Sequence, residues 1–340
     1  MDAATARHDP VKGNLLCFGR IPDESLRRPA RIAVLASGSS GSDVRFVQMQ
    51  LQKQGWDDSK DIWLEVPIFA GEEAIWRGDA SPVQQICFSS SLEGGESFVA
   101  VRFITRTLIF RPILQRLGPN RLDPRCLSEV LIDPSSGTSH VDVAFNPWFS
   151  RQFAIVDQSG SWSVHEFATK ASTRAECIHY HAWSATSTGQ SSDGWARILW
   201  VSGPSTIVVA DRCRVTLFDI SSGPVKLQDI DVGLIDFAGW VLDLVVLPSR
   251  PDCLYILTTT HVLLVTFEEN GNKDVEVRIA MRIRHFRSAE DISGRLHLFK
   301  DDAGKSGVHS RGRSQLTWRR HNDYPPLCVH VSTAIVPTCR

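Results

Sequence analysis

Two short stretches of the sequence carry residue types that could bind a phosphate or a metal ion. The run Gly304–Ser306 (GKS) matches the end of a phosphate-binding loop, but that loop needs an earlier glycine where this chain has Phe299. Cys177, His179 and His181 alternate along a predicted strand, so we expect them to share one face. A zinc site needs a further ligand. We therefore interpret this run as a surface cluster and expect no metal and no cofactor.

Serine and aspartate residues form no recognisable catalytic arrangement. The serines between Ser37 and Ser42 flank glycines, but the G-x-S-x-G turn that presents a nucleophilic serine is absent. Asp142, Asp157 and Asp219 lie in or beside predicted strands and turns, where carboxylates usually accept backbone hydrogen bonds. We predict that the protein is not an enzyme and that these carboxylates are structural.

Clusters of arginine are the remaining candidates for contact with a nucleic acid or a partner protein. We select Arg282, Arg284 and Arg287 as possible contact residues. No aromatic residues interleave with them, as they do where single strands stack on a protein. A solvated surface is the alternative, and salt-sensitive binding would favour contact with DNA.

Composition is that of an ordinary globular protein. The chain has 340 residues, of which 42% are hydrophobic and 22% charged, and its formal net charge is -1. No strong overall field therefore draws it to DNA or to an anionic membrane. The eight cysteines form no C-x-x-C pair, so we expect free thiols in a reducing compartment. No apolar run is long enough to span a bilayer, and we expect a soluble intracellular protein.

Short strands rich in β-branched and aromatic residues follow one another along the chain. Val99–Phe110, Phe153–Val156 and Trp162–Phe167 are examples, each bounded by turn-forming residues. The one short helix that the pattern suggests lies near Leu122–Val130, with Asp123 as its candidate N-cap. The predicted fold class is all-β.

The clearest repeat unit spans residues 141–167 and contains three strands. A turn at Asn146–Pro147 separates the first two, and a tight turn that ends at Gly160 separates the second from the third. Weaker copies begin near residues 83, 195 and 240.

The spacings between these units are 58, 54 and 45 residues, against about 40–45 for a standard WD40 blade. We attribute the excess to loop insertions at 116–133 and 168–193. Because a propeller blade is covered on both faces, all its strands look apolar. We therefore favour a WD40-like β-propeller with four to five blades over the alternative, a β-sandwich with long loops.

Ten residues of these units receive structural roles, and we expect the tryptophans to pack in cores and between blades. The set is Phe145, Asn146, Pro147, Trp148, Asp157, Gly160, Trp162, Trp195, Trp200 and Trp240.

One block of the sequence points to a family. His140–Val164 (HVDVAFNPWFSRQFAIVDQSGSWSV) is similar to a hallmark block of the propeller-bearing subunit of the RNA polymerase I core factor in filamentous fungi. Its Phe-Asn-Pro-Trp segment is more specific than the turn of a generic blade. Three further blocks look like the same family, Arg27–Gly38, Gly194–Trp200 and Arg284–Ser293.

The resemblance implies a nuclear and nucleolar scaffold in transcription initiation. It implies as partners the other core-factor subunits, TATA-binding protein and RNA polymerase I, and the ribosomal DNA promoter directly or through the complex. It implies no membrane and no small-molecule substrate. The alternative is a propeller scaffold in an unrelated assembly, such as a ubiquitin-ligase receptor or a trafficking complex.

We divide the chain into a flexible N-terminal segment (1–25), a propeller region (26–300) and an irregular, disordered tail (301–340). The strand pattern ends near Lys300, and the family's further blades, helices and Lys-rich tail find no counterpart after it. Our hypothesis is that the propeller is incomplete because the chain is truncated, with an out-of-frame end.

Overall fold

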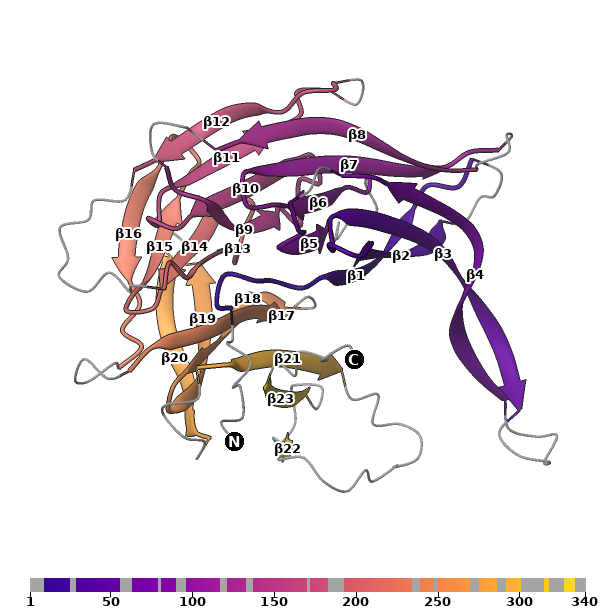
Figure 1. Cartoon of the computed structure of the whole chain (residues 1–340). Coiled ribbons are helices and arrows are strands. Elements are labelled where there is room, and N and C mark those ends of the chain that lie inside the picture. Colours follow the sequence, from indigo (N-terminus) through magenta and orange to yellow (C-terminus); the bar gives the residue numbers. More distant parts are fainter. Residues whose placement is uncertain are drawn as a thin grey trace, which may run out of the picture. The chain divides into compact units, whose positions relative to one another are not determined.

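In the computed structural model (Figure 1), every regular element of the described residues is a β-strand. None of these residues belongs to a helix that could cross a membrane. The described ranges are 9–24, 29–55, 63–78, 81–89, 96–116, 121–132, 137–169, 172–182, 193–233, 239–247, 250–269, 275–285, 292–300, 315–317 and 327–333.

One of two compact units comprises residues 11–185 and 194–199 and contains three complete antiparallel sheets. Within each of them the strands pair in chain order. The first has β1 (Leu16–Ile21), β2 (Ala30–Ser37), β3 (Asp43–Gly55) and β4 (Trp63–Trp76). The second has β5 (Gln85–Phe88), β6 (Val99–Arg102), β7 (Arg106–Leu114) and β8 (Leu122–Leu131). The third has β9 (His140–Phe145), β10 (Gln152–Asp157), β11 (Trp162–Glu166) and β12 (Glu176–His181).

The remaining strands continue the same pattern. A fourth sheet has β13 (Ala196–Trp200), β14 (Thr206–Asp211), β15 (Val215–Asp219) and β16 (Val225–Asp229). The fifth has β17 (Val241–Leu247), β18 (Arg250–Thr258), β19 (His261–Glu269) and β20 (Val275–Arg284). A three-stranded sheet has the order β21 (Gly294–Lys300), β23 (Leu327–Thr333) and β22 (Gln315–Thr317). The second compact unit comprises residues 1–10, 186–193 and 200–340.

The inner strands of the sheets are apolar on both faces, and this is why they are buried without alternation. All four residues of β6 are buried, and so are the first five of β14. Apolar clusters lie between consecutive sheets, as where Phe98, just before β6, stacks on Phe167, just after β11, with ring centroids 5.4 Å apart. The predicted all-β fold with propeller-like sheets is therefore confirmed.

The helix expected near Leu122–Val130 was wrong, because this segment forms strand β8. It pairs with β7 along its whole length, and the two end pairs are Leu122 with Leu114 and Leu131 with Arg106. Since β8 is the last strand of its sheet, Pro124 lies on an edge strand, where a missing N–H group is tolerated.

The repeat unit has four strands in the structure, whereas the sequence predicts three. The expected loop insertions at 116–133 and 168–193 contain the fourth strands β8 and β12. These outer strands are largely exposed, as β12 and β16 show, so they lack the apolar signature used to find strands. Strands also occur where none was expected, with β1 in the segment 1–25 and β22 and β23 in the segment 301–340. The domain boundaries themselves remain a prediction.

Candidate functional site

The Phe-Asn-Pro-Trp segment forms a capped turn between β9 and β10. The side-chain oxygen of Asn146 accepts hydrogen bonds from the backbone N–H groups of Trp148 (2.9 Å) and Phe149 (3.2 Å). Its Nδ2 donates to Gln152 at 2.7 Å. Asn146 is 1% exposed, so these bonds satisfy an amide that water does not reach. Pro147 and Trp148 are half-buried.

A second turn joins β10 to β11 and depends on a carboxylate and a glycine. Oδ1 of Asp157 accepts hydrogen bonds from the backbone N–H groups of Ser159 (2.8 Å) and Ser161 (3.0 Å). Gly160 has φ +83°, a left-handed conformation that suits glycine. The turn leads directly into Trp162, which is buried and stacks on the ring of His181 with centroids 5.4 Å apart.

The predicted aromatic residues lie mostly in the interior. Phe145, Trp195 and Trp200 are buried like Trp162. Trp240 is half-buried, and the guanidinium of Arg212 lies 5.4 Å from the centre of its ring.

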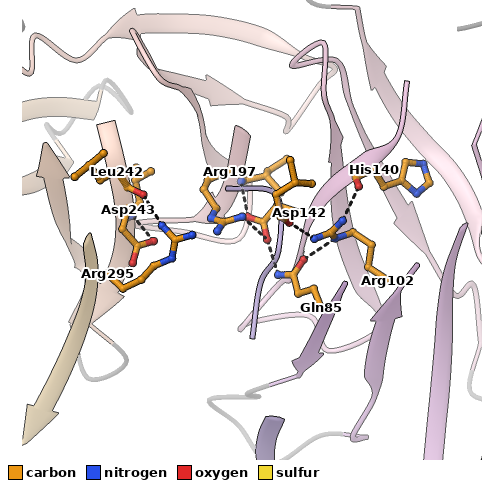
Figure 2. Close-up of polar contacts among 11 residues, drawn as sticks. Gln85, Arg102, His140, Asp142, Arg197, Leu242, Asp243 and Arg295 are labelled. Carbon is orange, nitrogen blue, oxygen red and sulfur yellow. Dashed lines mark hydrogen bonds and ion pairs between the residues drawn. The ribbon is translucent and has the colours of Figure 1, made fainter. Parts of the chain in front are cut away.

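A buried carboxylate of the first unit connects three strands of different sheets, β5, β9 and β13 (Figure 2). Asp142, the third residue of β9, accepts hydrogen bonds from Nε2 of Gln85 (2.6 Å) and from the backbone N–H of Ile198 (3.0 Å). The guanidinium of Arg197 lies 4.0 Å from the same carboxylate. Asp142 is buried, so its charge is balanced by Arg197 and by N–H donors rather than by water.

The second unit repeats this arrangement with different residues. Asp243, the third residue of β17, accepts a hydrogen bond from the backbone N–H of Leu296 at 2.9 Å. Arg295 donates to the carbonyl oxygen of Leu242 at 3.2 Å. In both units an aspartate on the first strand of one sheet binds the first strand of the next sheet, beside an arginine.

Two buried arginines make a further repeated contact. Arg102, at the end of β6, donates to the carbonyl oxygen of His140, the first residue of β9, at 2.8 Å. Arg212, just after β14, donates to the carbonyl oxygen of Val241, the first residue of β17, also at 2.8 Å. Asp193 balances the charge of Arg212 at 2.9 Å. Sequence reasoning missed both arginines; the signal available was an arginine at or just after the end of an apolar strand.

Two histidines of the third sheet, the half-buried His140 and the buried His165, lie where their surroundings disfavour the protonated ring. Burial lowers the pKa of His140 to about 4, with a further contribution from the Arg102 charge. Burial alone lowers the pKa of His165 to about 4, and its ring stacks on Phe153 with centroids 5.2 Å apart.

The run of Cys177, His179 and His181 does not share one face, contrary to expectation. His179 pairs with Val164 and Cys177 pairs with His165, which leaves Ile178 as a β-bulge residue. Because the bulge inserts one residue, Cys177 points to the face opposite His179. In the part of the chain that the structure describes, no group of three or more such ligands is placed to hold a metal ion.

A similar bulge in β20 determines the face on which two of the predicted arginines lie. Leu264 pairs with Met281 and Val265 pairs with Ile279, so Ala280 is the extra residue of β20. Arg282 and Arg284 therefore lie on one face, and Arg278 lies on the other. Arg287 falls outside the described residues.

Comparisons with known proteins identify a β-propeller family. The family described as Rrn6, beta-propeller, matches residues 9–319. The chain is 32% identical over 83 residues to the RNA polymerase I-specific transcription initiation factor RRN6 of Saccharomyces cerevisiae, which is 23% of this chain and 9% of that protein.

Among solved structures, the S. cerevisiae core factor matches with a TM-score of 0.67 and 15% identity, over 97% of this chain and 53% of that one. This chain thus spans about half the length of the core-factor chain that it matches. A chain of the Chaetomium thermophilum polycomb repressive complex 2 has a TM-score of 0.50 and 9% identity, over 89% of this chain and 64% of that one. At these sequence identities, the similarity to solved structures supports the fold alone. Since the family match extends over most of the sequence, the chain belongs to the Rrn6 β-propeller family.

Proposed function

We propose that this protein is a non-catalytic scaffold subunit of an RNA polymerase I core factor. The observation that supports this most strongly is the family match over residues 9–319. The similarity to the yeast initiation factor RRN6 and to a chain of the yeast core factor points the same way.

The buried polar contacts suit a scaffold. Asp142 and Asp243 accept backbone N–H groups of neighbouring sheets, and Arg102 and Arg212 donate to backbone carbonyl oxygens. Buried polar contacts of this kind hold elements in one arrangement. Loops and outer strands supported by such a frame can present a fixed surface to partner proteins.

The partners proposed are the other core-factor subunits, TATA-binding protein and RNA polymerase I. The complex would bind the ribosomal DNA promoter and recruit the polymerase, which places the protein in the nucleus and the nucleolus. In this mechanism the protein contributes geometry and makes or breaks no bond.

Affinity purification of the tagged full chain from nuclear extract, followed by mass spectrometry, tests the proposal. We expect core-factor subunits and TATA-binding protein to be enriched over a purification with an unrelated tagged WD40 propeller. Stable recovery of ubiquitin-ligase or trafficking-complex subunits in their place would assign the protein to a different assembly.

A further inference from the structure

We propose that Arg282, Arg284 and His261 form a binding site for the phosphate backbone of duplex DNA at one end of the β19–β20 pair. This inference rests on the proposed function, which brings the protein to a promoter. It goes further because it names the face, the residues and the chemical group that they would bind.

The strand register places the three side chains together. His261 lies directly opposite Arg284, and Leu263 lies opposite Arg282. Because side chains alternate between faces along a strand, all of these residues point to the same side. Arg282 and Arg284 are exposed and are two residues apart, a separation of about 6.6 Å along the strand. Two guanidinium groups at this separation can contact different phosphate groups.

The bulge at Ala280 is what aligns these two arginines with His261. Without the extra residue, positions 278, 282 and 284 would all share one face. With it, Arg278 lies opposite Thr266 on the other face of the sheet. One strand therefore carries two arginines on the proposed site and one exposed arginine that is excluded from it.

Gly233 supplies room for the guanidinium of Arg282. It has φ +65°, and a Cβ atom at this position would overlap the Arg282 guanidinium. Among the described residues, no carboxylate forms an ion pair with Arg282. The arginine head therefore rests on glycine backbone and keeps its N–H groups available for an anion.

The surroundings of His261 concentrate positive charge. Burial is the largest cause that lowers the pKa of His261, and the charges of Arg282, Arg284 and His285 lower it further. Nδ1 of His261 lies 2.8 Å from the hydroxyl of Thr260, and Nε2 has no partner among the described residues. An anion on this face would offset the charges of Arg282 and Arg284 and would raise the pKa of His261.

The test is DNA binding of the full chain at several salt concentrations. Fluorescence anisotropy with a labelled duplex, from about 50 to about 200 mM salt, gives the slope of log affinity against log salt. We expect Arg282→Ala and Arg284→Ala each to reduce the magnitude of this slope by about 1, and the double variant by about 2. Arg278→Ala is the matched control, with the same loss of charge from the same strand, and its slope should stay that of the wild type.

A second variant moves a charge without removing it. Gly233→Ala would displace the Arg282 guanidinium, so we expect it to weaken DNA binding as Arg282→Ala does. Thermal unfolding of each variant confirms that it is folded. Equal slopes for Arg278→Ala and for the Arg282/Arg284 double variant would overturn the site.

The outcome is separable from that of the proposed function. If the double variant still captures core-factor subunits and loses its salt-dependent DNA contact, both ideas stand. If it captures them and its DNA binding is that of the wild type, the phosphate site is rejected and the scaffold stands. If the wild type captures none of them and the double variant alone loses DNA contact, the scaffold assignment is rejected and the phosphate site stands.

Discussion

The carboxylate of Asp142 on β9 accepts a hydrogen bond from the backbone N–H of Ile198 on β13, at 3.0 Å. Asp243 on β17 makes the equivalent contact with Leu296 on β21, at 2.9 Å. An aspartate at this position satisfies a buried N–H that the first strand of a sheet would otherwise leave without an acceptor. The contact thus links sheet to sheet through one side chain.

Removal of this carboxylate should destabilise the protein strongly. Asp142→Ala removes the acceptor of the Ile198 backbone N–H and of the Gln85 side-chain amide. It also removes the carboxylate that lies beside Arg197. We expect a loss of about 3 kcal/mol in the free energy of unfolding, measured by urea denaturation. Glu176→Ala, at an exposed position of β12, is the control and should change the free energy by less than about 0.5 kcal/mol. Equal effects of the two variants would contradict the linking role.

The aspartates could be identified in the sequence, but their partners could not. Asp142 stands between Val141 and Val143 in an apolar strand, which marks a polar group that needs a partner. The donor is a backbone N–H 56 residues away. Every residue except proline carries that group, so side-chain patterns do not identify it.

The outer strands were hard to predict for a different reason. Four of them, β8, β12, β16 and β20, each carry one extra residue in their pairing with the third strand, and the bulge residues are Leu127, Ile178, Leu227 and Ala280. A bulge breaks the two-residue period on which strand and face assignments rest. The inner strands, where burial dictates residue type, were predicted well.

The buried indole of Trp162 should be one of the larger single contributions to stability. It is 1% exposed and stacks on His181. We expect Trp162→Ala to cost about 3–5 kcal/mol in the free energy of unfolding. Tyr180→Ala, which removes a ring that is 64% exposed on β12, should cost far less. A wild-type midpoint for Trp162→Ala in urea denaturation would reject the packing role.

The turn at Gly160 should tolerate substitution only by residues that adopt left-handed conformations. With φ +83°, Gly160→Ala should cost about 1–2 kcal/mol, because Cβ crowds the following carbonyl oxygen. Gly160→Asn is the matched comparison, since asparagine adopts this conformation more readily. Thermal unfolding should rank the variants glycine, asparagine, alanine, and a different order would show that backbone conformation does not limit this turn.

Acid should destabilise the third sheet through His140 and His165. The folded state holds both pKa values at about 4, below the ordinary value of 6.5. The unfolded chain therefore takes up protons first as the pH falls. The contribution of the neutral histidines to stability is fully present above pH 6.5 and is lost progressively between about pH 6.5 and pH 4, at about 1.4 kcal/mol per pH unit for each residue.

Urea denaturation across this pH range measures the effect, and one variant isolates the contribution of His165. His165→Phe keeps a ring against Phe153 but removes one titrating group. The two histidines together contribute part of the slope of unfolding free energy against pH. We expect His165→Phe to remove about half of that part. An unchanged slope would mean that His165 is already protonated in the folded protein, or that it is exposed to water, and either result contradicts its burial as a neutral ring.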